Sequence, residues 1–351
     1  MMIVVAFIYL LICLLGIKIG AQEDYLSKEK TSSIKGIFIL LVFFSHFNSY
    51  VTYTDQFDLL WDKLITSFGQ TMVTLFLFYS GYGIAYSIIK KGKEYVDAIP
   101  YKRVFLTLVR FDIAVFIYAL IKLMLHESFS FQTFCLSLIG FDSMGNSNWY
   151  VFTILALYLC TYIAFCIFKG SNFYACIFQI VLTVAYIIIM RYVFNKELYW
   201  YDTALCYNVG MFFAFNEAKI NRILNNNKTY AILLIICFIA TLFFRLNLIN
   251  ALVDILLMIS FSILVVLLSR KISLHNKILK WMGDHLFEIY ILQRIPMILL
   301  NKLFNNIYIY IYIYIIASFT ITILLAIVFR YVTDKIVQKI NKYTIKETSY
   351  E

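Results

Sequence analysis

The feature that most constrains this chain is a series of apolar runs that recur from one end to the other. Most are about 18 residues or longer, the length that a helix needs to cross a hydrocarbon core of roughly 30 Å. A segment in lipid must satisfy its backbone hydrogen bonds internally, so we expect helices. We predict an all-α, polytopic transmembrane helical bundle of about 10–11 helices. The expected spans are residues 2–19, 35–53, 69–89, 104–124, 149–168, 173–194, 203–215, 229–246, 250–269, 285–303 and 306–330.

The composition agrees with a protein whose surface is largely covered by lipid. Hydrophobic residues make up 62% of the 351 residues and charged residues only 14%. That is more apolar surface than one soluble core of this length could bury. With two prolines, twelve glycines and no long polar stretch, the sequence offers no place to divide off an extramembrane domain. We therefore interpret the chain as one membrane domain.

The basic residues fall mainly in alternate loops between the apolar runs. The formal net charge is +10, which in a soluble protein would suggest a nucleic-acid partner. Here the positive-inside rule accounts for the charge, and we expect no nucleic acid to bind. The basic side is predicted to be cytoplasmic, so the N-terminus lies outside and the C-terminus inside a plasma membrane that the chain crosses many times. The other side receives only Lys63, Lys122, Arg191, Lys196, Arg245 and Lys302.

Four segments carry expectations of their own. Residues 1–20 are interpreted as an extra N-terminal transmembrane helix. Residues 331–351 form a basic cytoplasmic tail, either a helix on the anionic inner leaflet or a plain solvated tail. Residues 125–148 form the longest outside loop, and their apolar middle suggests a piece that lies on or dips into the outer leaflet. Residues 307–316 alternate with period two, but a helix is expected, because an isolated strand in lipid leaves its backbone unpaired.

The cysteines do not indicate a metal or a disulfide framework. All seven lie singly in apolar segments, with no CxxC pair and no histidine at ligand spacing. We predict no metal site and interpret these cysteines as small core or lipid-facing residues. Any chemistry must then come from the few ionisable side chains inside the spans.

His46 is the histidine that lies well inside an apolar run. Ionisable residues inside membrane spans are costly and are functional candidates by default. Lys35 lies eleven residues earlier, so an ideal helix puts both side chains within about 20° of one face and about 16 Å apart along the axis. The cation could hold an anionic donor, and the imidazole could act as a base near neutral pH. The alternative is a histidine that only hydrogen-bonds between helices for packing.

The stretch KGIFILLVFFSHF, residues 35–47, resembles the opening motif of the acyltransferase-3 family. In that motif an arginine and a histidine are separated by ten residues at the start of a helix. Here the spacing is kept, with Lys35 in place of the arginine. A lysine keeps the charge but loses the planar bidentate fork, so the donor contacts are expected to differ. The resemblance implies that His46 is catalytic and that Lys35 binds the donor.

Three further stretches resemble the family in order and spacing. Residues 76–82, FLFYSGY, resemble its FFFxSGY segment, and residues 148–151 resemble the WF element that begins a middle helix. Residues 282–293 resemble the late segment LGxxSxxIYLxH, with Leu286 for the serine and Gln293 for the histidine. These stretches contain the candidates for a structural role or for the acceptor path: Ser80, Gly81, Trp149, Glu288, Tyr290 and Gln293. Arg294 shares a helix face with Tyr290 and Gln293.

Basic residues near the start of the following helix are further candidates. The family tends to carry an RxxR pair there, whereas this chain has Lys102 and Arg103, followed by Arg110. Arg103, Thr107 and Arg110 share one helical stripe, so both arginines could bind a phosphate-bearing donor. The alternative is that they are positive-inside anchors and that Arg110 pairs with Asp112.

The resemblance covers about residues 33–330 and implies a membrane-embedded O-acyltransferase. It implies transfer of an acyl group, usually acetyl, from cytoplasmic acyl-CoA to a hydroxyl of an extracytoplasmic saccharide, glycolipid or other cell-surface acceptor. Acyl-CoA, expected to be acetyl-CoA, is then a co-substrate, and no permanently bound cofactor is expected. Lys35, helped by Arg103, would fix the donor, while His46 would remove the proton from the attacking hydroxyl, directly or through an acyl-histidine.

Two other classes of membrane protein share this composition. A glycan polymerase would be expected to carry a large basic outside loop, and none of the outside loops is basic; a flippase belongs to the same alternative. A small-molecule transporter would favour broken helices in matching halves, and we find no internal repeat. We favour the acyltransferase and keep both classes as alternatives.

Overall fold

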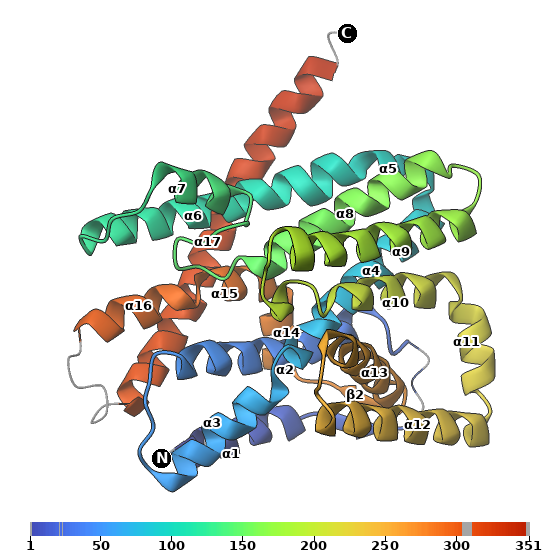
Figure 1. Ribbon diagram of the computed structural model, residues 1–351, viewed down its shortest axis with the longest axis horizontal. Helices are drawn as coiled ribbons and strands as arrows, with labels where there is room; N and C mark the ends of the chain where they lie inside the picture. Colours follow the sequence, from blue (N-terminus) through green and yellow to red (C-terminus); the bar gives the residue numbers. More distant parts are fainter. Residues whose placement is uncertain (1, 21, 23, 304–310, 349–351) are drawn as a thin grey trace.

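The architecture is almost entirely helical. The structure, a computed structural model, describes residues 2–20, 22, 24–303 and 311–348. The long helices pack into a single body, from which the C-terminal end of the chain projects (Figure 1). The elements are α1 (Met2–Leu14), β1 (Ile17–Ile19), α2 (Lys28–Asn48), α3 (Gln56–Phe68), α4 (Thr71–Lys91), α5 (Lys93–Ile99), α6 (Leu106–Met124), α7 (Phe131–Leu138), α8 (Trp149–Ile167), α9 (Asn172–Ile188), α10 (Ala204–Phe215), α11 (Glu217–Leu224), α12 (Asn227–Leu246), α13 (Ala251–Ser269), β2 (Ile272–Leu274), α14 (Lys277–Asp284), α15 (Leu286–Leu292), α16 (Arg294–Leu303) and α17 (Ile311–Thr348). Shorter helical stretches are the π-helices Pro100–Phe105 and Ile189–Val193 and the 3₁₀-helix Leu198–Trp200.

Eight helices among the described residues are long and apolar enough to cross a membrane. Each overlaps one of the spans predicted from the sequence. Two of them contain two helices each: α3 and α4 lie in one, and α5 and α6 lie in another. The chain is therefore a multi-pass membrane protein, as predicted. The eight are Lys28–Asn48, Gln56–Lys91, Lys93–Met124, Trp149–Ile167, Asn172–Val193, Asn227–Leu246, Ala251–Ser269 and Ile311–Lys342.

The other three predicted spans correspond to shorter or interrupted helices. α1 has 13 residues and α10 has 12. The span predicted for residues 285–303 is divided into α15 and α16. Pro296 explains the division, because it lacks the N–H that would bond to the carbonyl of Leu292, the last residue of α15.

The N-terminal segment differs from the single membrane helix predicted for residues 1–20. After α1 the chain turns at Gly16 and forms β1, which pairs antiparallel with β2. Gly16 has a φ of +81°, in the left-handed region that favours glycine. A Cβ there would also lie 2.5 Å from the backbone oxygen of His275. The strand pair thus attaches the N-terminal segment to the loop that precedes α14.

Helices α4 and α10 touch at a reciprocal pair of glycines. A Cβ at Gly81 would lie 2.0 Å from the carbonyl oxygen of Tyr207, and a Cβ at Gly210 would lie 2.0 Å from that of Phe78. Only glycine permits two backbones to approach so closely, a packing mode common between membrane helices. Gly81, predicted as a structural residue, therefore sets the distance between α4 and α10.

A second glycine contact joins α2 to α14. A Cβ at Gly36 would lie 2.0 Å from a carbonyl oxygen of α14, and a Cβ at Gly283 would lie 1.8 Å from one of α2. Each of these glycines has a charged neighbour in the sequence: Lys35 directly precedes Gly36, and Asp284 directly follows Gly283. The close helix contact therefore brings this cation and this carboxylate to the same part of the molecule.

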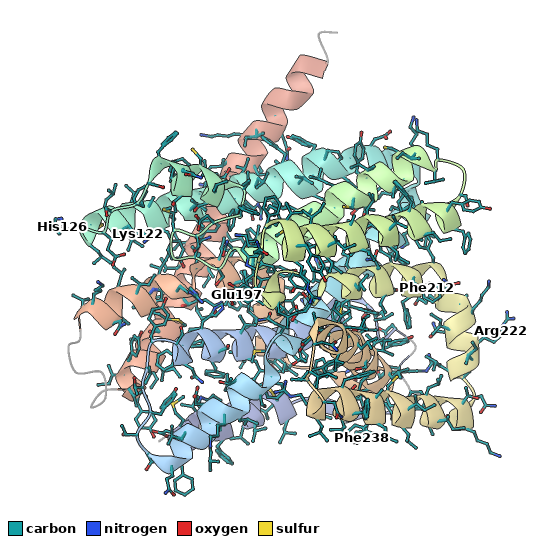
Figure 2. All side chains as sticks on the ribbon, in the orientation of Figure 1. Lys122, His126, Glu197, Phe212, Arg222 and Phe238 are labelled. Carbon is teal, nitrogen blue, oxygen red and sulfur yellow. The ribbon has the colours of Figure 1, made fainter. Side chains whose placement is uncertain are left out.

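α12 covers the outside of the body. Tyr230 is its one buried residue, whereas Ile235, Phe238 and Ile239 are each more than half exposed. Phe238 points away from the other helices (Figure 2). Apolar side chains exposed along a whole helix are expected where lipid rather than water covers the surface.

The last helix continues from the membrane body into the basic tail. α17 runs without a break for 38 residues, and its C-terminal part projects from the body (Figure 1). The tail is therefore helical up to residue 348. Within residues 307–316, the part from 311 onward is helical as predicted, and residues 307–310 lie outside the described residues.

Candidate active site

A large cavity lies among α2, α4, α8 and the segment where α14 meets α15. Its volume is about 870 Å³, which is in the range of small-molecule and cofactor sites. Side chains from segments far apart in the sequence line it, and many are polar or aromatic. Those that matter below are Asp24, Lys28, Lys35, Ser80, Tyr82, Arg103, Tyr150, Tyr158, Glu217 and Asp284.

Three cationic side chains line this cavity. Lys28 and Lys35 come from the first half of α2, and Arg103 comes from the π-helix between α5 and α6. Among the described residues, no carboxylate lies within 4.0 Å of any of the three. Arg103 instead donates from Nε to the hydroxyl of Tyr95 at 2.9 Å. The cavity thus offers positive charges that are free to bind an anion.

The carboxylates that line the cavity, in contrast, already have partners. Asp24 accepts a hydrogen bond from the ammonium of Lys30. Glu217 accepts one from the hydroxyl of Tyr82 at 2.9 Å. Because these carboxylates are engaged, they oppose an incoming anion less than their number suggests.

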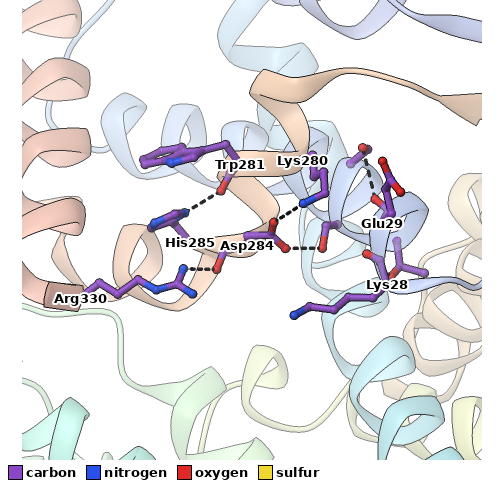
Figure 3. Close-up of polar contacts among 10 residues, drawn as sticks. Lys28, Glu29, Lys280, Trp281, Asp284, His285 and Arg330 are labelled. Atoms are coloured by element: carbon purple, nitrogen blue, oxygen red, sulfur yellow. Dashed lines mark hydrogen bonds and ion pairs between the residues drawn. The ribbon is translucent and has the colours of Figure 1, made fainter. Parts of the chain in front are cut away.

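Asp284, at the end of α14, is the third carboxylate that lines the cavity, and it accepts several hydrogen bonds (Figure 3). Its carboxylate accepts hydrogen bonds from Ser32 Oγ at 2.7 Å and Lys280 Nζ at 2.8 Å, and its carbonyl accepts one from Arg330 Nη1 at 2.9 Å. Partial burial disfavours the charged form, yet the bonds from Lys280 and Ser32 hold the pKa of Asp284 below its usual value. An ionised Asp284 therefore attracts Lys35 without pairing with it.

Arg103 lies on a widened helical turn. Pro100 has no N–H and its ring clashes with the carbonyl four residues earlier, and residues Pro100–Phe105 form a π-helix. Such bulges are frequent at functional sites. Here the bulge carries Arg103 on the cavity wall, next to Tyr95 and Tyr158.

His46 lies beyond the cavity wall, on the same helix as Lys35. It is half-buried and is not one of the side chains that line the cavity. Its Nδ1 is 3.5 Å from Ser147 Oγ, and its ring centroid is 6.2 Å from that of Tyr290. Tyr290 packs edge-on against Tyr150 at 5.4 Å, and Tyr150 lines the cavity. Two tyrosine rings therefore separate His46 from the cavity.

Ser80 connects the tyrosines on the cavity wall. Its hydroxyl interacts with the hydroxyls of both Tyr150 and Tyr158, and Tyr158 lies beside Arg103. Polar groups thus continue from Arg103 along the wall to the tyrosine pair that borders His46.

A compact turn before α8 places Ser147 against His46. The Ser143 hydroxyl donates to the carbonyl of Asn146 at 2.7 Å, and Asn148 Nδ2 donates to the carbonyl of Gly140 at 2.9 Å. Asn146 and Ser147 are both buried. The end of the predicted outside loop therefore turns into the protein and contributes to the site.

A family model described as an acyltransferase domain matches residues 32–331. The chain belongs to the acyltransferase-3 family. The match covers most of the chain, including His46, Lys35 and Arg103. No curated protein and no solved structure matches the chain. The protein is therefore a membrane acyltransferase.

The cavity brings together several of the candidate residues that were identified from the sequence. Lys35, Ser80 and Arg103 line it, although they come from three separate segments. His46 and Tyr290 lie next to each other beyond its wall. The motifs that define the family thus surround one site.

Arg110 lies away from this cavity. Its Nη2 is 2.7 Å from the carboxylate of Asp334 and its Nη1 is 3.9 Å from that of Glu288. Asp112, the partner considered from the sequence, has a buried carboxylate oxygen without a hydrogen bond. The structure therefore gives Arg110 and Glu288 the geometry of a structural ion pair between α6, α15 and α17, rather than of a donor site.

Two other predicted residues serve the surroundings of the site. Trp149 packs its ring against Tyr150 and Tyr199, with centroids 6.1 and 5.9 Å away. Gln293 is fully buried at the break between α15 and α16, where its amide donates to the carbonyl of Tyr290. Both residues hold tyrosines in position.

Sequence reasoning missed three side chains of the site. Tyr150 and Tyr158 are eight residues apart, which puts them on one face of α8, so helical spacing could have identified them. Ser147 comes from an irregular turn. No periodic signal marks such a residue, and its contact with His46 is visible only in the folded chain.

Proposed function

We propose that this protein transfers an acyl group, acetyl in the first place, from acyl-CoA to a hydroxyl of a saccharide or glycolipid acceptor across the membrane. The observation that carries this proposal is the arrangement along α2. Its first half contributes unpaired cations to a large cavity, and its second half carries an imidazole about 16 Å farther along the axis. Such a separation suits acyl-CoA, because its phosphates and its thioester lie at opposite ends of a long arm.

The cavity suits the phosphate-bearing part of CoA. Lys28, Lys35 and Arg103 would form charge-assisted hydrogen bonds with phosphate oxygens. The uncharged arm that carries the thioester would then follow the wall formed by Ser80 and Tyr158 toward His46. The packed rings of Tyr150 and Tyr290 lie between the cavity and His46, so the arm would have to pass beside them. A short acyl group such as acetyl would fit there more easily than a long chain.

His46 would act as the general base. As the acceptor hydroxyl oxygen attacks the thioester carbonyl carbon, His46 takes the hydroxyl proton; the carbon–sulfur bond then breaks, and CoA leaves as a thiol with that proton. Ser147, next to Nδ1, would fix the ring orientation and leave Nε2 for the proton transfer.

The end of the molecule that carries Lys35 is proposed to face the cytoplasm. The loops at this end are rich in lysine and arginine, as the positive-inside rule requires. Arg222 and Lys122, predicted on opposite sides of the membrane, lie at opposite edges of the molecule (Figure 2). In this orientation, within the plasma membrane, acyl-CoA enters from the cytoplasm and the acceptor from outside.

The test is the acyl content of the cell surface. O-acetyl groups on surface glycans are measured by mass spectrometry in cells with and without the gene. We expect a specific O-acetyl group to be lost without the gene and restored when it is returned. An identical O-acetyl content in the two strains would contradict the proposal.

A further inference from the structure

A second cavity lies at the other end of α2 from Lys35. Its volume is about 210 Å³, which is small for a whole cofactor but sufficient for one sugar ring. The side chains relevant here are Tyr50, Tyr118, Lys122, Glu127, Asn301 and Lys302. Aromatic rings on the walls and polar groups at the edge suit a sugar, which has both apolar C–H faces and hydroxyls.

One wall residue of this second cavity lies close to His46 in the sequence. Tyr50 follows His46 by four residues, in the turn just after α2, and its amide donates to the carbonyl of Phe47. Met144 and Gly145 also line the cavity, and they belong to the turn that places Ser147 against His46. The second cavity therefore approaches His46 from the side opposite the large cavity, although the imidazole lines neither of them.

Arg294 does not line the second cavity itself but lies next to Tyr50 and Tyr118, which do. It interacts with the hydroxyl of Tyr50 and lies close enough to Tyr118 and His46 for electrostatic interaction. Among the described residues no carboxylate lies within 4.0 Å of its guanidinium, and its Nε is buried without a hydrogen bond. Arg294 is half-buried, and a cation without a counter-ion inside a membrane protein is costly. Its anion is therefore expected to come from a ligand.

We propose that the second cavity binds the acceptor and selects a sugar unit that carries an acidic group, a carboxylate or a phosphate, paired with Arg294. This inference rests on the proposed acyltransferase function and specifies its substrate class. Arginine presents a planar fork that matches both anions. With the acidic group held there and the ring against Tyr50 and Tyr118, a ring hydroxyl lies beside His46.

The edge of the second cavity also attracts anions. Lys122 and Lys302 share one carboxylate, Glu127, at 3.6 and 3.2 Å. Two ammonium groups and one carboxylate leave a positive charge uncompensated. Such a charge at the mouth of a cavity steers anionic ligands toward it.

The first test uses the full wild-type chain in lipid nanodiscs. Ligand-observed NMR compares the affinities of methyl β-D-glucuronide, methyl β-D-glucoside and methyl β-D-glucoside 6-phosphate, which share one ring. We expect at least one acidic sugar to bind about tenfold more tightly than the neutral one, because it gains a hydrogen bond to a charged group. The acidic sugar with the higher affinity identifies the anion. Equal affinities, a preference for the neutral sugar, or no binding by any of the three would overturn the proposal.

The second test assigns the anion to Arg294. Arg294→Gln should bind the acidic and neutral sugars equally, Arg294→Lys should keep part of the preference, and Arg245→Gln, on the distant helix α12, should keep all of it. Acetyl-CoA binding is measured for each variant and confirms that the protein is folded. A full acidic preference in folded Arg294→Gln overturns the assignment. If wild type binds acetyl-CoA but shows no acidic preference, only the acceptor inference fails and the acyltransferase function stands.

Discussion

Individual charges without partners define both ends of the proposed reaction path. Lys28 and Lys35 line the first cavity, and Arg294 lies next to two tyrosines of the second; among the described residues none of the three has a carboxylate within 4.0 Å. Arg110, in the same helical body, is instead held by Asp334 at 2.7 Å. Lys28 is exposed, but Lys35 and Arg294 are only partly exposed, and unpaired cations are costly inside a membrane protein. The proposed anionic substrates would supply the missing counter-charges.

Lys35→Ala should weaken acyl-CoA binding about tenfold or more, since a hydrogen bond to a charged group contributes about 1.5–3 kcal/mol. Lys35→Arg should retain the affinity, because it keeps the charge and adds a bidentate fork. Lys228→Ala, an exposed lysine at the start of α12, is the control. Isothermal titration calorimetry of the purified variants measures the effect. Wild-type affinity in Lys35→Ala would leave this lysine with only a role in topology.

Arg103 and Arg110 should respond differently to the same substitution. Arg103→Gln should weaken acyl-CoA binding, because Arg103 lines the cavity without a carboxylate partner. Arg110→Gln should bind acyl-CoA almost normally but melt at a lower temperature, because the buried Glu288 loses its cation and Asp334 keeps only Arg330, at 3.9 Å. Calorimetry and thermal unfolding of both variants decide the matter. A larger loss of donor affinity in Arg110→Gln would reverse these assignments.

Side-chain positions could be predicted where they depend on local geometry. Helical spacing was sufficient to put Lys35 and His46 on one face, because both belong to one regular helix. It could not pair Arg110 with Asp334, which lies 224 residues later. It could not find Ser147 either, because hydrogen bonds within an irregular turn place that side chain.

Among the elements, the contact between α4 and α10 is one of two close helix approaches near the site. Gly81 and Gly210 allow each backbone to touch the other. Ser80 precedes Gly81 and lines the large cavity. The contact between these two helices therefore helps to fix the position of α4, which carries Ser80.

Gly81→Ala should lower the thermal stability, because a Cβ 2.0 Å from the Tyr207 oxygen forces the two backbones apart. Gly83→Ala is the matched control, since nothing lies within 4 Å of a Cβ at that position. Alanine there should be neutral or stabilising by about 0.5–1 kcal/mol, because glycine is a poor helix former. Melting of the purified proteins measures both, and equal melting temperatures for the two variants would contradict this account of the contact.

Hydropathy predicted the long helices and not their interruptions. Eight expected spans overlap membrane-length helices, because an apolar run of sufficient length has few alternatives in lipid. The division between α15 and α16 follows from Pro296, which an average over the run conceals. The strand β1 forms through pairing with β2, about 250 residues away, and a long-range pairing of this kind leaves no local signal.

On the scale of the whole molecule, two cavities of different size approach His46 from opposite ends of α2. In the proposed function, the larger cavity, which is lined by cations, holds the phosphate-bearing donor. The smaller cavity, whose aromatic wall lies next to Arg294, holds the acceptor. Donor and acceptor would then not share a cavity and would meet at the imidazole. Such an arrangement suits a transfer between the two sides of a membrane.

The orientation of the chain can be tested with single cysteines on a background without the seven native ones. Ser128→Cys, in the predicted outside loop, should react in intact cells with a membrane-impermeant maleimide. Lys93→Cys, in a basic loop, should react only after the membrane is permeabilised, as the positive-inside rule requires. Both positions are exposed, so access alone does not explain a difference. Labelling of Lys93→Cys from outside would contradict the topology.

The central claim is that His46 is the base of the transfer, and the most direct test is the acetyl-transfer rate of purified His46→Gln. Glutamine keeps a hydrogen-bonding side chain near Ser147 but cannot accept the proton. General-base catalysis typically contributes about 10²- to 10⁴-fold in rate. We therefore predict a loss of that size, with acetyl-CoA binding and thermal stability close to wild type. A transfer rate near that of wild type in His46→Gln would show that the histidine serves packing and would contradict the account.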